Sequence, residues 1–404
     1  MNSSTRPAVR TFDVLVIGGG NAGIAAAARL LRRGVTDVAV IESQTVHVYR
    51  PLLSYVGGGE ASMGSAERTQ RSVTPRGCTW LRDPAVEVDA DAKTVRCAGG
   101  ATYGYRDLVL GVGLVTDEDA LPGLGDALDS PAVASNYVDR AEKTWDLVRA
   151  MPRGGHAVFT VPRPPVSCTG TTVKPVFLAA AHWKRAGLLP GVTMTLLIDR
   201  PALLGVPALD DALLHHLAEL DVQVSHDTAV TAIDPGHQEI TATGVDGDER
   251  RIRYDMLHLV PPFRGPTWVA ESGLAAAGSH GLVDVDSRTF RHRTHPDVWA
   301  VGDCATVDTD PSGGALRRQT SILVDNLLAA RRGATTLTEY DGYTVAPVTT
   351  DTRHLIFGEY DRTGALSSSL PSFIDPVAPH RFAWALDRFA LPVTYWNLIL
   401  KGLA

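Results

Sequence analysis

The first part of the chain with a clear pattern of apolar and polar positions is residues 12–42. FDVLVI is a short β-branched apolar run of the kind found in strands, and the alanine- and leucine-rich stretch after it has helical composition and ends at Gly34. DVAVIES then has the pattern of a second short strand. Because two strands joined by a helix lie parallel, this segment predicts a βαβ unit.

Residues 49–131 have weaker patterns. The stretch 49–76 is rich in Gly, Ser and Pro and predicts a loop with a short helix. Two later stretches predict strands: WLRDPAVEVDADAKTVRC and TYGYRDLVLGVG. A Gly- and Pro-rich sequence near Leu124–Pro131 marks a domain boundary, and NYVDRAEKTWDLVRAM predicts an amphipathic helix beyond it.

The middle of the chain repeats the order of elements found at its start. It predicts the strand HAVFTV, the helix PVFLAAAHWKRAG, the strand VTMTLLIDR, the helix LDDALLHHLAEL, and strands in VQVSHDTAVTAID and ERRIRYDMLHLVPPF. From Gly281, strands in GLVDVD and DVWAVGD precede a long helix from about Ser312 to Arg332. The tail from Tyr340 predicts short strands and an aromatic-rich helix. We expect an α/β fold with two Rossmann-like units in tandem.

Composition narrows the class of protein. A chain of 404 residues with 44% hydrophobic residues can bury two or three cores, and a net charge of -7 without a long basic block disfavours a nucleic acid partner. The four cysteines are widely separated and lack metal-type spacing, so we expect neither a disulfide framework nor a bound metal. We find no secretion signal and no membrane-spanning run, which favours the cytoplasm.

A GxGxxG pattern at the first strand–helix junction indicates a dinucleotide site. Glycines let a pyrophosphate approach the backbone amides at a helix N-terminus, and a carboxylate at the end of the next strand can bind ribose hydroxyls. A purely structural glycine turn is the alternative. The candidate contacts are the three glycines, the two residues between the second and the third glycine, and that carboxylate. They are Gly18, Gly20, Asn21, Ala22, Gly23 and Glu42.

Two later stretches resemble signatures of flavoproteins with two dinucleotide-binding domains. YRDLVLGVG ends at Gly113 and is similar to their second-strand signature, and HPDVWAVGD ends in Gly302 and Asp303 and is similar to their late one. In those proteins the aspartate accepts a ribityl hydroxyl, and the next helix points its N-terminus at the flavin. The resemblance implies FAD rather than NAD, with a plain helix cap as the alternative for Asp303. The other candidate FAD contacts are Arg50, Ala85, Gly313 and Gly314.

These assignments predict a discontinuous FAD-binding domain over residues 1–125 and 281–335. Residues 126–280 would form a second Rossmann-like domain without a nucleotide fingerprint, and residues 336–404 an aromatic-rich C-terminal segment. The first strand of the second domain runs into PRPPVSCTG, where only Gly170 is left of any glycine pattern. Prolines have no amide to donate to a pyrophosphate, so reduction by NAD(P)H is disfavoured.

Several stretches, in the same order from about residue 12 to the C-terminus, resemble the type II sulfide:quinone oxidoreductases. They are PPVSCTGTTVKPVFLAAAHWKRAG, YDMLHLVPP, HPDVWAVGDC, YDGYTVAP and YWNLILKG. The family consists of membrane-associated flavoproteins that pass electrons from sulfide to quinone. By this resemblance Cys168 lies near the flavin and carries sulfur, and Lys174 matches the family lysine six residues later.

Cys168 is the candidate nucleophile. A positive side chain and a nearby helix N-terminus both favour a thiolate, which is the form that a sulfur nucleophile needs. A small buried side chain without a chemical role is the alternative. We expect the other three cysteines, Cys78, Cys97 and Cys304, to be structural.

The chain departs from the family pattern at three places. Ala346 stands where the family has its second redox cysteine, and Pro311 stands about where the family has a lysine near the flavin. The sequence ends at Ala404, before the amphipathic helix that completes the family's membrane anchor, so we expect weak or no membrane association. Docking of the tail onto its own protein or onto another subunit of a homo-oligomer is left open.

Three functions are compatible with these features. The first is an FAD-dependent oxidoreductase that takes two electrons from a sulfur donor (sulfide, persulfide or thiol) through Cys168, with quinone as a candidate acceptor and a low-molecular-weight thiol in place of the absent cysteine. The second is a diverged flavoenzyme that acts on a small organic molecule. The third is a non-catalytic FAD-bound protein.

Overall fold

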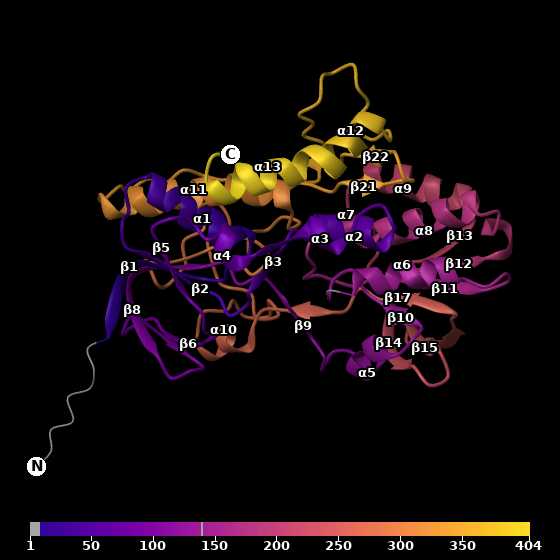
Figure 1. Ribbon diagram of the computed structural model, residues 1–404, viewed down its shortest axis with the longest axis horizontal. Helices are drawn as coiled ribbons and strands as arrows, with labels where there is room; N and C mark the ends of the chain where they lie inside the picture. The colour runs from indigo at the N-terminus through magenta and orange to yellow at the C-terminus, as the bar shows by residue number, and fades with distance from the viewer. Residues whose placement is uncertain (1–8, 139) are drawn as a thin grey trace, which may run out of the picture.

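The computed structural model of the protein describes residues 9–138 and 140–404, in which two sheet-centred regions lie side by side (Figure 1). One region contains strands from residues 10–110 and 298–300, and the other contains strands from residues 133–258. The C-terminal segment runs along the top of both. The first residues of the chain, where we expected no secretion signal, and Asp139, in the expected amphipathic helix, lie outside the described residues.

The first region is built on a seven-stranded sheet with the order β5-β2-β1-β8-β7-β6, in which β19 also pairs with β8. The pairs β5/β2, β2/β1, β1/β8 and β8/β19 are parallel, and β6/β7 and β7/β8 are antiparallel. β19 arrives from more than 180 residues further along the chain than β8, so this region is discontinuous in sequence. Its strands are β1 (Arg10–Ile17), β2 (Val38–Ile41), β5 (Cys78–Leu81), β6 (Ala85–Asp89), β7 (Thr94–Cys97), β8 (Thr102–Leu110) and β19 (Val298–Ala300).

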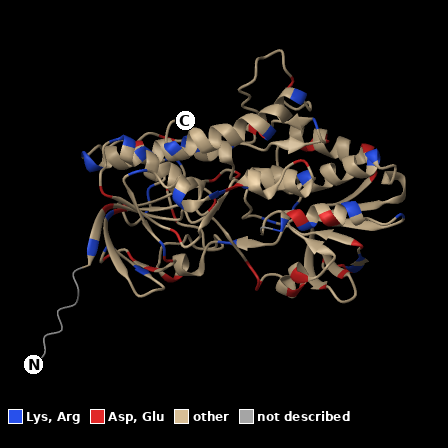
Figure 2. Ribbon diagram, in the orientation of Figure 1, with Lys and Arg blue, Asp and Glu red and all other residues tan. Residues whose placement is uncertain are grey.

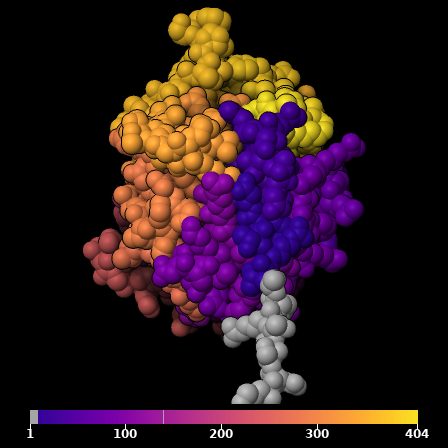
Figure 3. All heavy atoms as spheres, turned by 90° about the vertical axis from the view of Figure 1, so that its left-hand side faces the viewer, coloured from indigo at the N-terminus to yellow at the C-terminus, as the bar shows by residue number. Residues whose placement is uncertain are grey.

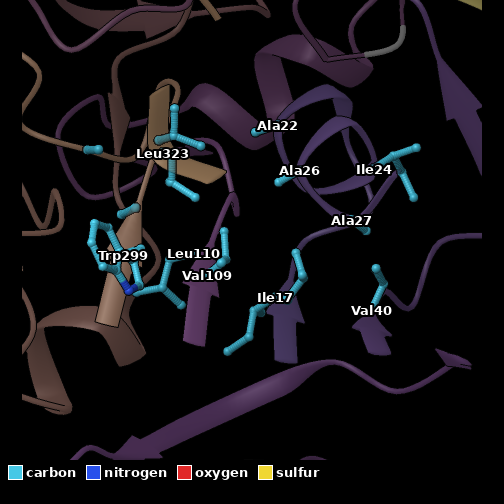
Figure 4. Packing of buried hydrophobic residues seen from close by; sticks show 14 of the residues in the cluster. Ile17, Ala22, Ile24, Ala26, Ala27, Val40, Val109, Leu110, Trp299 and Leu323 are labelled. Carbon is cyan, nitrogen blue, oxygen red and sulfur yellow. The ribbon is translucent and has the colours of Figure 1, made fainter. Parts of the chain in front are cut away.

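Two helices pack on this sheet, α1 (Asn21–Arg32) and α11 (Gly313–Arg331). Figure 4 shows side chains of both helices and of the strands meeting in one core. α1 contributes several alanines, whose small side chains let the helix backbone approach the strands, together with Ile24 and Leu30. The strands supply larger side chains such as Ile17 and Trp299. The position of the first turn of α1 above the carboxyl end of β1 follows from this packing.

The second region has a five-stranded, all-parallel sheet with the order β10-β17-β11-β12-β13. A separate antiparallel sheet, β14-β15-β16, is inserted in sequence between β13 and β17 of the parallel sheet. The parallel strands are β10 (Val133–Ala134), β11 (His156–Val161), β12 (Thr193–Ile198), β13 (Val222–Ser225) and β17 (Met256–His258), and the antiparallel ones are β14 (Thr228–Asp234), β15 (Glu239–Gly244) and β16 (Glu249–Arg253). The longer helices of the region are α6 (Ala141–Ala150), α8 (Lys174–Arg185) and α9 (Pro207–Glu219). The prediction of two Rossmann-like units in tandem is therefore confirmed.

The C-terminal segment contains two short hairpins and a chain of short helices. The hairpin strands are β20 (Thr344–Val345) with β23 (Glu359–Tyr360), and β21 (Val348–Thr349) with β22 (Leu355–Ile356). The helices are α12 (Arg381–Ala385), a π-helical turn (Leu386–Ala390), α13 (Leu391–Asn397) and a final 3-10 turn (Ile399–Lys401). The last turn lies against α1, where Arg32 Nε donates to Lys401 O at 2.6 Å (Figure 3).

Local differences from the expected elements are few. GLVDVD forms only isolated bridges instead of a strand, and ERRIRYDMLHLVPPF is split between β16 and β17, which lie in different sheets. The stretch 49–76 holds three short helices, α2 (Pro51–Gly57), α3 (Met63–Ala66) and α4 (Gln70–Val73), and a strand, β4 (Glu67–Thr69), that pairs with β3 (Val46–Val48). The remaining short elements are β9 (Val115–Thr116), β18 (Phe263–Arg264), α5 (Leu124–Asp129), α7 (Thr169–Thr172) and α10 (Thr267–Glu271).

Candidate active site

The three glycines of the first turn have three different environments. A Cβ on Gly18 would lie 2.4 Å from Gly111 O, and one on Gly23 would lie 1.8 Å from Gly18 O, so both positions need glycine for close packing. A Cβ on Gly20 would meet no protein atom within 4 Å. Gly20 is also the residue before α1, whose first amides are free to bind an anion. These roles match those of a dinucleotide-binding turn.

Glu42 is held at the end of β2 by backbone amides. Its carboxylate accepts from Gly19 N and from Gln44 N, both at 2.7 Å. A cavity of about 540 Å³ opens beside it, and its lining includes Gly18, Glu42, Ser43 and the predicted contact Ala85. A space lined by both the glycine turn and a fixed carboxylate fits the adenosine and pyrophosphate portion of FAD.

The later signatures meet at the same edge of the sheet. Gly113 has a φ of 66° and open space where a Cβ would be, and Gly302 has a φ of 81° and packs between Ala22 of α1 and Leu316 of α11. Burial raises the pKa of Asp303, while a hydrogen bond from Ser167 and the charge of Arg50 oppose this shift. Asp303 is thus in contact with the Cys168 loop, as a residue between flavin and cysteine would be.

The start of α11 also lies at this edge. Ser312 caps the helix by accepting from Ala315 N at 3.0 Å. Gly313 is open, but a Cβ on Gly314 would lie 2.5 Å from Val345 Cγ1. Gly314 is therefore explained by packing against β20, and Gly313 is the better candidate for approach of the backbone to the flavin. Together the open glycines, Glu42 and Asp303 fit FAD.

Cys168 immediately precedes α7 with a backbone φ of 55°. Residues other than glycine seldom adopt such a conformation, at a cost of about 1–3 kcal/mol, and it is concentrated at functional sites. The side chain is partly accessible, and Thr171 Oγ1 donates to its Sγ at 3.2 Å. The loop after β11 therefore holds one cysteine in a strained and accessible position.

Burial of Cys168 opposes the thiolate form that we expected from the sequence. Burial, and next the charge of Asp310, raise the pKa of the Cys168 thiol to about 11, while Thr171 and Lys174 act in the opposite direction with smaller effect. Lys174 is fully buried, and its Nζ donates to Asp387 Oδ2 at 3.1 Å. Asp387 also accepts from the Tyr55 hydroxyl at 2.6 Å. The lysine charge is therefore largely compensated by the C-terminal segment.

Ala346 lies where the resemblance places the second redox cysteine, and it packs against the Cys168 loop. A Cβ on Gly170 would lie 2.7 Å from Ala346 Cβ. Ala346 is 1% exposed, and its backbone N donates to Gly358 O at 2.8 Å. Gly170 is thus needed for this contact, which explains the one glycine left in the loop. Alanine at position 346 cannot form a disulfide, so Cys168 has no protein thiol as partner here.

The other three cysteines have features of structural residues. Cys304 is buried and its Sγ contacts Leu110 O and Val301 O at 3.7 and 3.6 Å. Burial raises the pKa of Cys78 to about 12 and that of Cys97 to about 11.

Arg318 pairs with Asp341 at 2.8 Å and stacks on Tyr343, so this part of α11 has its charge compensated at the surface.

Sequence reasoning missed the polar residues that surround Cys168. Tyr137 donates from its hydroxyl to Cys168 O at 3.4 Å, and Asp310 accepts from Thr169 N at 3.1 Å and from Thr169 Oγ1 at 2.5 Å. Arg200 and Tyr360 are close enough for their charges to interact with Asp310. Tyr137, Arg200, Asp310 and Tyr360 come from four separate segments, and no local motif in the sequence links them.

At the carboxyl end of the second sheet a smaller cavity of about 300 Å³ remains. It is lined by residues of the β11 and β12 ends, among them Pro162, Arg163 and Asp199, and Arg163 forms a double hydrogen bond with Asp199 at 2.7 and 2.9 Å. The prolines leave few amides for a pyrophosphate, as expected.

Comparisons with known proteins agree with this geometry. The family model described as pyridine nucleotide-disulphide oxidoreductase matches residues 12–322, which defines the class as FAD-dependent oxidoreductases with two dinucleotide-binding units. The mitochondrial sulfide:quinone oxidoreductase of Mus musculus is 31% identical over 395 residues, or 97% of this chain and 87% of that protein. The protein of the same name from Dictyostelium discoideum is 29% identical over 392 residues, or 96% and 86% of the two chains. The chain belongs to the sulfide:quinone oxidoreductase family.

A solved structure shows the same fold. The sulfide:quinone oxidoreductase from the hyperthermophilic bacterium Aquifex aeolicus superposes with a TM-score of 0.80 at 18% identity, over 98% of this chain and 92% of that one. The predictions of FAD as cofactor and of an oxidoreductase are confirmed by these matches, and the non-catalytic alternative is dropped. Within the described part of the chain, no helix combines the length and the apolar character needed to cross a membrane.

Proposed function

We propose that the protein oxidises a reduced sulfur compound at Cys168 and delivers the two electrons through FAD to a quinone. The observation that carries this proposal is Cys168 itself, in a strained conformation at the position where a nucleotide-binding turn would otherwise lie. The carbonyl of Cys168 accepts from Tyr137, and the backbone N of Thr169 donates to Asp310. These contacts hold the loop beside Asp303, which is hydrogen-bonded to Ser167. The names of the relatives support sulfide as donor and quinone as acceptor.

A low-molecular-weight thiol takes the place of the second family cysteine, because Ala346 cannot react. Cys168 and this thiol form a mixed disulfide, which releases two electrons and two protons. Hydrosulfide then attacks the sulfur of the external thiol, the sulfur–sulfur bond breaks, and Cys168 leaves as a thiolate while the external thiol departs as a persulfide. FAD, held at the glycine turn and Asp303, would supply the two-electron acceptor for disulfide formation and the route from there to the quinone.

Residues around Cys168 move and hold the protons. Asp310 accepts the proton from the Cys168 thiol, since burial raises the pKa of Asp310 to about 6 and places it in the range of a general base. Thr171 donates a hydrogen bond to Sγ and stabilises the developing thiolate. The Lys174–Asp387 pair holds the start of α8 against the C-terminal segment. Gly20, Glu42, Gly113 and Asp303 would hold the FAD.

For the acceptor, the outer surface of the C-terminal helices supports a quinone that enters from a membrane surface. Four apolar side chains of α12, the π-helical turn and α13 are exposed: Phe382, Leu386, Phe389 and Val393. Their arrangement on one short segment suits shallow, peripheral contact with lipid. The cytoplasmic location and the homo-oligomer expected from the sequence stay predictions.

The replacement of a redox cysteine by Ala346 also favours a second candidate function, oxidation of a small organic molecule by FAD. Anaerobic mixing of the FAD-loaded protein with sulfide and a thiol separates the two functions. We expect the visible flavin absorbance to bleach and to return when a soluble quinone is added. A flavin that no sulfur compound reduces would contradict the proposal and favour the organic substrate.

A further inference from the structure

The proposed reaction leaves three polar side chains near Cys168 without an assigned role in substrate binding. Arg200 follows β12, Tyr360 ends β23, and Asp310 precedes α11. Thr169, the neighbour of Cys168, links two of them: Arg200 Nη2 donates to Thr169 Oγ1 at 3.4 Å, and Thr169 Oγ1 donates to Asp310 at 2.5 Å. The three side chains therefore gather on one side of the reactive thiol.

Two hydrogen-bond donors in this cluster have no partner. The Tyr360 hydroxyl and Arg200 Nε are both buried atoms without a hydrogen bond, and the Tyr360 side chain is only 5% exposed. An unpaired buried donor costs roughly 1–3 kcal/mol, so native proteins rarely keep one without a reason. Burial raises the pKa of Tyr360, and the charges of Asp310 and Cys168 add to this shift, so the hydroxyl belongs to the same cluster as these two groups. Two unpaired donors in one cluster suit a carboxylate.

The charges of the cluster restrict what that carboxylate can belong to. Arg200 is the positive group, and both Asp310 and Asp210 act on it. Asp210 is already bound by Leu204 N at 2.7 Å and Gly205 N at 3.0 Å. A simple anion would increase the excess of negative charge, which is costly in a poorly hydrated site. A ligand that carries an ammonium group together with its carboxylate adds no net charge.

We infer that Arg200, Tyr360 and Asp310 bind the external thiol of the reaction, and that this thiol is an amino-acid thiol of the cysteine type. Its carboxylate accepts from Arg200 Nε and the Tyr360 hydroxyl, its ammonium donates to Asp310, and its sulfur meets Cys168. Arg200, Asp310 and Cys168 each keep part of their surface accessible, as a binding site requires. This inference rests on the proposed function and names the class of its co-substrate.

Four thiols separate the contributions of the two charged groups. L-cysteine carries both groups, 3-mercaptopropionate only the carboxylate, cysteamine only the ammonium, and 2-mercaptoethanol neither. The rate of anaerobic flavin reduction is measured for the FAD-loaded protein with each, at equal thiolate concentration. We expect L-cysteine to react fastest and 2-mercaptoethanol slowest, and a mixed disulfide with L-cysteine to be found on Cys168 by mass spectrometry.

Two variants test the assignment of the carboxylate. Arg200→Gln should slow flavin reduction by L-cysteine and by 3-mercaptopropionate roughly tenfold or more. The rates with cysteamine and 2-mercaptoethanol, which lack a carboxylate, should stay within about twofold of those of the unaltered protein. Tyr360→Phe removes only the unpaired hydroxyl, keeps the ring, and should have the same selectivity with a smaller effect. Arg163→Gln is the matched control, because Arg163 lies at the same sheet edge but is exposed and pairs with Asp199.

Asp310→Asn tests the ammonium. Because Asp310 also accepts a proton in the proposed reaction, all four rates should fall, and the readout is the ratio of L-cysteine to 3-mercaptopropionate, which should move toward one. Equal rates for the four thiols in the unaltered protein, or equal slowing of all four by Arg200→Gln, would overturn the inference and leave the proposed function standing. If neither sulfide nor any thiol reduces the flavin, the proposed function itself fails.

Discussion

The loop after β1 and the loop after β11 occupy the same place in two units of the same topology, but they present different groups. The first ends in an open glycine, Gly20, with free amides behind it. The second contains prolines and Cys168, and its one glycine, Gly170, is used for packing against Ala346. The Rossmann topology thus positions a loop at the carboxyl end of a strand, and the residues of that loop decide whether it binds a phosphate or carries a thiol.

The two regions also differ in where their polar groups come from. Glu42 and the glycine turn lie within one βαβ unit, so the first site is local in sequence. The Cys168 site draws on β12, the segment before α11, and the C-terminal hairpin. Charged residues of both signs are distributed over both regions (Figure 2). The second site therefore depends on the relative placement of distant segments, and the following changes test that dependence.

Replacing Cys168 should have the largest effect. Cys168→Ala removes the sulfur that forms the mixed disulfide, so turnover with sulfide should fall by at least ~1,000-fold, as it does when an enzyme loses its nucleophile. FAD content should not change, because the open glycines and Glu42 are untouched. The measurement is quinone reduction per bound FAD. Cys78→Ala is the control, and turnover that survives in Cys168→Ala would show that the second loop is not the electron entry.

Replacing Asp310 should have the next largest effect. Burial raises the pKa of this carboxyl to about 6, so below that pH it is protonated and cannot take the proton of Cys168. The rate of flavin reduction by sulfide and thiol should therefore increase with pH through about 6. In Asp310→Asn this increase should disappear, and the rate at neutral pH should be roughly 100-fold lower. An unchanged pH profile in the variant would assign the proton transfer to another group.

A change at Gly20 tests the first loop by itself. A Cβ there meets no protein atom, so Gly20→Val should fold normally but place its side chain in the space for the pyrophosphate. We expect affinity for FAD to fall roughly tenfold or more, a loss comparable to one or two charge-assisted hydrogen bonds. FAD titration of the apoprotein and its thermal unfolding are the measurements. Gly125→Ala, also at an open glycine, should leave the affinity for FAD unchanged, and normal FAD binding by Gly20→Val would remove the turn from the site.

The same comparison explains what could be predicted from the sequence. The glycine turn was predictable because its spacing encodes both the tight turn and the helix start. The cluster of Arg200, Asp310 and Tyr360 was not, since these residues lie more than 100 positions apart at their extremes and meet only in the folded chain. The environment of Cys168 was also not predictable, because sequence spacing revealed Lys174 but neither the burial of the thiol nor the pairing of the lysine with Asp387.

Restoring the second cysteine gives a direct test of the thiol requirement. Ala346 is buried against Gly170, so the extra sulfur of Ala346→Cys should lower the free energy of unfolding by about 1–3 kcal/mol. Because position 346 contacts the loop that carries Cys168, the new cysteine can supply the second sulfur from within the protein. Flavin reduction by sulfide should then no longer need an added thiol, while Ala346→Ser, of similar size but without a redox-active sulfur, should still need it. If both variants need the added thiol equally, the external thiol does not replace a cysteine at position 346, and the proposed mixed disulfide is contradicted.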